Sequence, residues 1–79
     1  MTPAEEKIRT VLQPLAKAPL PADADASLFD LGVLDSFGLM DAVACLEDAF
    51  GVKVPDADLT PRRFETLAKI EAYFTSRAS

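Results

Sequence analysis

The chain has 79 residues, 49% of them hydrophobic, with one cysteine, no histidine and a formal net charge of −5. This length predicts one domain covering residues 1–79 and argues against a deep substrate cavity. One cysteine excludes an internal disulfide, the missing imidazole excludes a Ser-His-Asp triad, and no apolar run reaches the ~20 residues that span a bilayer.

The first predicted element is a helix that begins at Pro3. Thr2 is a good N-cap residue, Pro3 suits the first helical position, and Glu5 completes a capping box. Pro14 has no amide hydrogen to donate, so the helix is expected to end or kink near Gln13. Apolar residues recur at helical spacing along one stripe: Ile8, Val11, Leu12 and Leu15.

A long loop is predicted from Ala18 to Asp35. Connections of this length in compact domains are often functional or internally packed. Apolar residues around Gly32 are therefore expected to pin the loop to the core, and Ser27 is placed to cap a short helical turn. The pinning residues are Leu28, Phe29, Leu31, Val33 and Leu34.

The second helix has the strongest pattern and is predicted to run from Ser36 to about Phe50. Asp35 is its N-cap, and Gly51 ends it because glycine readily adopts the left-handed conformation that follows many helices. Its predicted core face contains Leu39, Met40, Val43, Leu46 and Phe50.

The last third of the chain predicts one short helix and one longer helix. Pro55 breaks the chain, and Asp56 to Phe64 is expected to hold the short helix, with Thr60 and Pro61 as a second cap-then-proline signal. A final helix is predicted over roughly Thr66 to Arg77, with Leu67, Ile70 and Phe74 inside. The sequence thus predicts an all-α bundle of three main helices and one short helix.

Negative charge is concentrated in the middle of the chain. Residues 22–58 contain nine Asp or Glu and only Lys53 to oppose them, a local balance of −8. This balance predicts repulsion of nucleic acid and of anionic membranes and attraction of basic protein surfaces. The alternative is a solvated face that only keeps the protein soluble.

Two pairs of aspartates imitate the opening of a calcium loop but lack its later ligands. Neither Asp23 with Asp25 nor Asp56 with Asp58 is followed by the central glycine and the twelfth-position glutamate of an EF-hand. Both pairs are predicted to be solvated turns, and no metal site is expected.

The pair Asp35-Ser36 is the candidate functional site. Ser36 lies in the first turn of the second helix, where free backbone amides and the helix dipole favour an attached phosphate. An Asp-Ser pair at a helix start is also a common cap without further function. The pair alone therefore leaves both interpretations open.

The residues around this pair resemble the phosphopantetheine attachment region of acyl carrier proteins. The resemblance runs through 28–40 (LFDLGVLDSFGLM), continues through 46–52 (LEDAFGV) and ends at 64–67 (FETL), so it covers nearly the whole chain. It implies the acyl-carrier-like bundle and a 4′-phosphopantetheine group on Ser36. A phosphopantetheinyl transferase would install the group from coenzyme A, and Cys45 would not be the thiol that carries cargo.

Details of the attachment region distinguish among carriers. Carriers of fatty acid synthesis usually have Leu after the serine and often an acidic residue next, whereas this chain has Phe37 and Gly38. Asp35, the residue before the serine, favours an acyl carrier or a freestanding aminoacyl carrier such as the D-alanyl kind. A discrete carrier of a specialised biosynthetic pathway fits these residues better than a fatty acid synthase carrier.

A docking surface is predicted beside Ser36. Phe37, Asp41, Ala44 and Asp48 follow one another by four, three and four residues, so they form one stripe, which we call the Phe37 stripe, opposite the core face. Phe37 would anchor a partner and the carboxylates would steer basic surfaces. The alternatives are that Phe37 packs against the preceding loop and that the carboxylates are only solvated.

Further docking residues follow from the same reasoning and from the resemblance. The resemblance implies that Asp35, besides capping the helix, contacts the transferase. Glu47 and Asp56 are weaker members of the docking set.

The sequence therefore predicts a monomeric, cytoplasmic carrier that is not itself an enzyme. Its partners would be the transferase and acyl- or aminoacyl-activating ligases, synthases or transferases with basic docking surfaces. Two alternatives remain: an acidic interaction module that is never modified, and an enzyme using Glu47 and Asp48. Adjacent helix residues point about 100° apart, which disfavours the enzyme.

Overall fold

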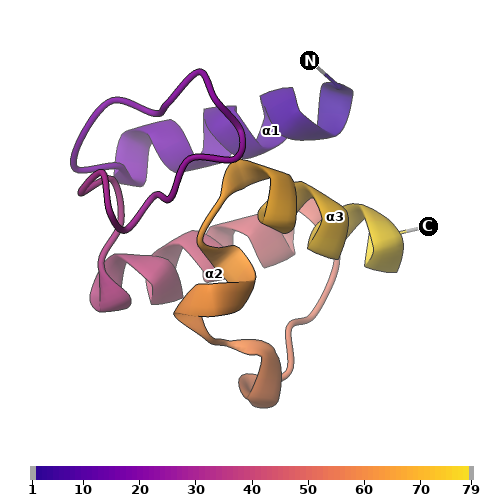
Figure 1. The fold of residues 1–79 in the computed structure, drawn as a ribbon. Helices are drawn as coiled ribbons and strands as arrows, with labels where there is room; N and C mark the ends of the chain where they lie inside the picture. Colours follow the sequence, from indigo (N-terminus) through magenta and orange to yellow (C-terminus); the bar gives the residue numbers. More distant parts are fainter. Residues whose placement is uncertain (1, 79) are drawn as a thin grey trace.

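A computed structural model describes residues 2–78 and shows an all-helical fold (Figure 1). No strand occurs in this part of the chain, so the predicted all-α class is confirmed. Within the same residues no helix is long and apolar enough to cross a membrane. The elements are α1 Pro3–Leu12, the 3₁₀ turn η1 Gln13–Leu15, α2 Ser36–Phe50, the 3₁₀ turns η2 Asp56–Asp58 and η3 Pro61–Phe64, and α3 Leu67–Ala78.

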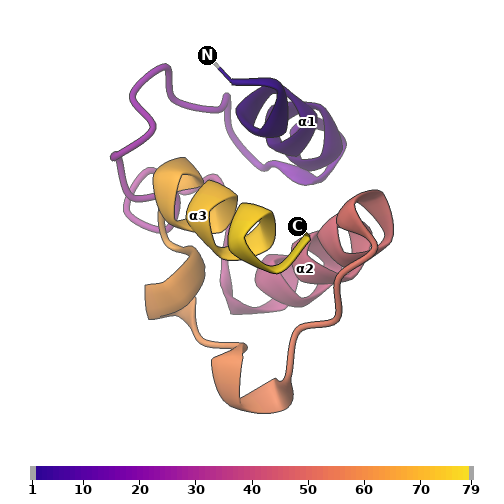
Figure 2. The same cartoon turned by 90° about the vertical axis from the view of Figure 1, so that its right-hand side faces the viewer.

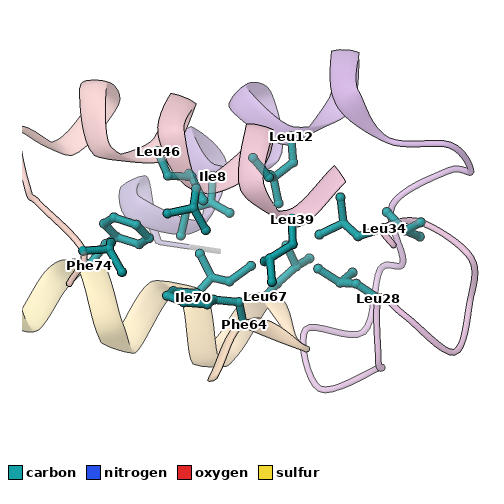
Figure 3. Packing of buried hydrophobic residues seen from close by; sticks show 14 of the residues in the cluster. Ile8, Leu12, Leu28, Leu34, Leu39, Leu46, Phe64, Leu67, Ile70 and Phe74 are labelled. Carbon is teal, nitrogen blue, oxygen red and sulfur yellow. The ribbon is translucent and has the colours of Figure 1, made fainter. Parts of the chain in front are cut away.

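The three α-helices enclose one apolar core. Helix α1 packs against both α2 and α3, and the view in Figure 2 shows the three helices around a common centre. The side chains that meet there come from every helix and from the loop before α2 (Figure 3). The largest fully buried ones are Phe64, Phe74, Ile8, Leu12, Leu28, Leu46, Leu67, Ile70 and Val33.

Thr2 and Gly51 act at the helix ends as predicted, but Glu5, which was predicted to complete the capping box, pairs with Arg9 instead. The Thr2 hydroxyl accepts a hydrogen bond from the Glu5 amide at 3.1 Å, while the Glu5 carboxylate lies 3.3 Å from Arg9 Nε. Helix α1 gives way to a 3₁₀ turn at Gln13, next to Pro14. Helix α2 ends at Gly51 with φ of 66°, the left-handed conformation that glycine adopts without strain.

Two residues predicted to be buried are exposed. Met40 is 55% exposed because it lies about 100° round α2 from Leu39, and Ala42 takes an inward position instead. Leu31 is 51% exposed because it lies within successive tight turns, in which its amide donates to the Ser27 carbonyl.

The segment between α2 and α3 differs from the predicted single short helix. It forms two 3₁₀ turns, and Pro61 begins the second of them because its missing amide hydrogen prevents one continuous helix. Asp58, predicted to be solvated, is half-buried and accepts a hydrogen bond from the Tyr73 hydroxyl at 2.8 Å. It also pairs with Arg63 at 3.6 Å and Arg77 at 3.3 Å, which ties η2 to η3 and α3.

Candidate functional site

Ser36 is the first residue of α2 and its side chain is exposed. The preceding Asp35 has extended backbone angles, and its Oδ1 accepts a hydrogen bond from the Gly38 amide at 2.6 Å. Asp35 is therefore the N-cap of α2, as predicted. The cap fixes the first turn of the helix and leaves the Ser36 hydroxyl at the surface.

The loop before Ser36 is anchored on both sides of its turn. Leu28, Val33 and Leu34 are buried, and the Val33 and Leu34 amides both donate to the Leu28 carbonyl, at 2.9 and 3.2 Å. The Leu28 amide in turn donates to the Glu65 carbonyl at 2.7 Å, which joins the loop to the segment that precedes α3. Ser36 thus stands on a packed support, although it is itself exposed.

Lys17 connects the first helical segment to this site, which sequence reasoning did not predict. Its Nζ forms an ion pair with Asp35 Oδ2, and its backbone amide donates to the Val33 carbonyl at 3.0 Å. The contact joins residues 18 positions apart through the loop, so no local sequence pattern indicates it. A lone cation before an acidic segment was the only available signal.

The pKa of the Asp35 carboxyl lies below its ordinary value. The largest cause is the hydrogen bond from Lys17, followed by the hydrogen bond from the Gly38 amide. A lowered pKa in the folded state means that this carboxylate stabilises the fold above its ordinary pKa. That contribution is lost as the pH falls through the folded-state pKa.

Replacing Lys17 with methionine is expected to raise the pKa of Asp35 toward its ordinary value, because the largest cause of the depression is removed. Carbon-detected NMR of the side-chain carboxyls against pH measures the change. Lys69→Met is the matched control, since Lys69 pairs with Glu65 on another part of the surface. An Asp35 pKa that is the same in Lys17→Met and the wild type would contradict the ion pair.

Gly38 makes room for the cap. A Cβ atom at this position would lie 3.2 Å from Asp35 Oδ1 and 3.8 Å from a Leu34 methyl. The first distance is tighter than ordinary contact, so a larger residue would press on the capping carboxylate. The small residue after Phe37 therefore has a structural reason in this chain.

The surroundings of Ser36 fit an attached phosphodiester. The hydroxyl is exposed, and the start of α2 carries the partial positive charge of the helix dipole. The ammonium of Lys17 lies on Asp35, so a cation is present beside the position where a second negative charge would be added. These features meet the steric and electrostatic needs of such a group.

The Phe37 stripe is exposed along its whole length. The Phe37 side chain is 86% exposed, so the alternative in which it packs against Val33 or Leu34 is wrong. Asp41, Ala44 and Asp48 are exposed on the same face of α2. The exposed ring leaves apolar surface in water, which a bound partner would cover.

The remaining predicted docking residues do not all join this stripe. Glu47 is half-buried and its carboxylate accepts a hydrogen bond from the Val54 amide at 2.7 Å, so it holds the chain that leaves α2. Asp56 is exposed but lies on η2, a separate element. Met40 and Leu31 are exposed apolar side chains that sequence reasoning did not include in the site.

Comparison with known proteins adds independent information. The family described as "Phosphopantetheine attachment site" matches residues 6–74 of the chain. D-alanyl carrier protein 2 of Lactiplantibacillus plantarum is 33% identical over 76 residues, which cover 96% of this chain and 95% of that protein. The D-alanyl carrier protein of Streptococcus uberis is 36% identical over 66 residues, 84% of each chain. No solved structure gave a significant match.

Proposed function

The chain belongs to the phosphopantetheine attachment site family, and from this premise we propose that Ser36 is the residue to which the 4′-phosphopantetheine arm is attached. The observation that carries the proposal is the exposed Ser36 hydroxyl at the capped start of α2. Asp35 holds the first turn, and Lys17 supplies the neighbouring positive charge.

The protein is a carrier and not itself an enzyme. The arm supplies a terminal thiol on which an acyl or aminoacyl group is held as a thioester. The chain's own residues present that group: α2 places Ser36, the packed loop supports it, and the Phe37 stripe offers a surface beside it.

D-alanine is the cargo that the relatives favour. The two D-alanyl carrier proteins described above match this chain over most of its length. The proposed partners are a phosphopantetheinyl transferase and a ligase that activates D-alanine with ATP. The proposed site of this work is the cytoplasm, where coenzyme A and ATP are available.

Two successive mass increases are the expected result of loading the purified protein. Coenzyme A and a broad-specificity transferase should add one phosphopantetheine. ATP, D-alanine and a D-alanine-activating ligase should then add one alanyl group that hydroxylamine removes, because thioesters react with it. Intact-mass spectrometry measures both steps, with a glycine-activating ligase and glycine as the parallel reaction. If that ligase loads the carrier as well as the D-alanine-activating ligase does, the cargo assignment fails while the carrier assignment stands.

Reversing two charges of the Phe37 stripe is expected to weaken transferase docking. In Asp41→Lys/Asp48→Lys, the transferase KM for the carrier should rise about tenfold at low salt, because steering depends on charge complementarity. The difference should shrink as salt is added.

The control changes the net charge equally at another place. Asp23 and Asp25 are exposed in the loop before α2. Asp23→Lys/Asp25→Lys should leave KM within about twofold of the wild type, since the attraction is assigned to the stripe. Equal losses in both double variants would show that only the overall charge matters.

A further inference from the structure

A groove runs between α1 and α2 and has a volume of about 550 Å³. Figure 2 shows α1 at the upper right and α2 below it. The walls combine side chains of α1, η1 and α2. The lining residues are Thr10, Val11, Pro14, Leu15, Cys45, Asp48 and Ala49.

The groove is open because its lining side chains are small or constrained. Cys45 and Ala49 are short, so α2 does not fill the space that faces α1. Pro14 belongs to the 3₁₀ turn that ends the first helix, and Leu15 follows it at the edge of the core. The result is a mostly apolar surface hollow in which Cys45 is exposed.

The groove adjoins the Phe37 stripe and shares Asp48 with it. Cys45 comes four residues after Asp41, which places it about 40° further round α2. A helix lying along the stripe would therefore have the groove at its side. Asp48 stands where the acidic stripe and the apolar hollow meet.

The charges around the groove and the Phe37 stripe indicate what kind of partner would fit both. Helix α2 contains Asp41, Glu47 and Asp48 but no Lys or Arg. The cations of α1 are already engaged, because Arg9 donates to the Pro21 and Ala22 carbonyls and Lys7 lies over the Phe50 ring. An occupant that combines positive charge with apolar side chains would complement both parts.

We propose that the α1–α2 groove receives apolar side chains of a basic amphipathic helix that belongs to a partner enzyme and lies along the Phe37 stripe. Lysine or arginine side chains of that helix pair with Asp41 and Asp48, while its apolar side chains enter the groove beside Cys45 and Ala49. This inference rests on the proposed carrier function, since a carrier must be recognised by several enzymes.

The single cysteine provides a direct test with the unmodified protein, in which no arm or cargo can fill the groove. The probe is a helical peptide of leucine and lysine, and its control is the same peptide with glutamate in place of lysine. At saturation the basic peptide should slow alkylation of Cys45 by iodoacetamide about tenfold or more, because bound apolar side chains cover the thiol. The acidic peptide should not.

A groove-filling variant separates the hollow from the charges around it. Ala49→Met should weaken the basic peptide's affinity about fivefold or more without changing any charge, whereas Ala72→Met on the exposed face of α3 should not. NMR shifts should centre on Thr10, Cys45 and Ala49. Protection of Cys45 is measured on the wild-type protein as well, so the proposal is still tested if one variant folds poorly.

Three outcomes would overturn the groove assignment. The first is that the basic peptide does not bind, and the second is that it binds but leaves the rate of Cys45 alkylation unchanged. The third is that, without any peptide, protection of Cys45 rises with protein concentration. The last would assign the groove to a second copy of the chain. The basic peptide should protect Cys45 in Ser36→Ala as it does in the wild type. Failure of this inference and failure of arm attachment are therefore distinguishable.

Discussion

Replacing Phe74 with alanine is expected to destabilise the protein by about 3–5 kcal/mol, because truncating a buried aromatic side chain removes its burial and leaves a cavity. Phe74 is fully buried in α3. Its ring stacks on Phe50 with centroids 5.4 Å apart and lies 6.2 Å from Phe64. A domain of this size has a total stability of roughly 4–12 kcal/mol, so one substitution removes a large share of it.

Urea denaturation followed by circular dichroism measures the loss in free energy of unfolding. Phe37→Ala is the matched control, because the same side chain is removed from a position that is 86% exposed. The control should change stability by no more than about 0.5 kcal/mol. Similar losses of stability in the two variants would contradict the assignment of Phe74 to the core and Phe37 to the surface.

Phe37→Ala is expected to impair recognition while leaving the fold intact. An exposed aromatic anchor commonly contributes about 2 kcal/mol or more to binding, which corresponds to a loss of roughly 30-fold in kcat/KM for the transferase. The loss should lie mainly in KM, because the ring is assigned to docking and not to the reacting atoms.

A conservative substitution tests whether the apolar side chain of Phe37 is what the transferase recognises. Phe37→Leu preserves an apolar side chain beside Ser36 and should recover most of the activity that alanine loses. The transferase assay with both variants at fixed salt concentration measures the difference. If Phe37→Ala retains full kcat/KM, the ring does not anchor this partner.

The features of this fold that could be predicted from sequence have local determinants. Thr2, Asp35 and Gly51 act within one turn of the helix that each begins or ends, and their roles follow from residue type. Helical periodicity likewise placed Leu39, Val43 and Leu46 in the core and Phe37 at the surface. The attachment region resembles its family over a continuous stretch, so Ser36 could be singled out from sequence.

The remaining features depend on contacts between distant segments. The ion pair of Lys17 with Asp35 and the hydrogen bonds that Tyr73 and Arg77 donate to Asp58 join residues 15 to 19 positions apart. Met40 was misplaced because the edge of the apolar stripe depends on how the neighbouring segments cover α2. The residue spacing within one helix does not indicate which of its sides the neighbouring segments cover.

The most direct test of arm attachment at Ser36 is peptide mapping by mass spectrometry after incubation with coenzyme A and the transferase. A single phosphopantetheine is expected on the Ser36 peptide of the wild type and of Ser76→Ala, and none is expected on Ser36→Ala. Attachment at another residue, or none on wild-type protein that circular dichroism shows to be folded, would contradict attachment at Ser36.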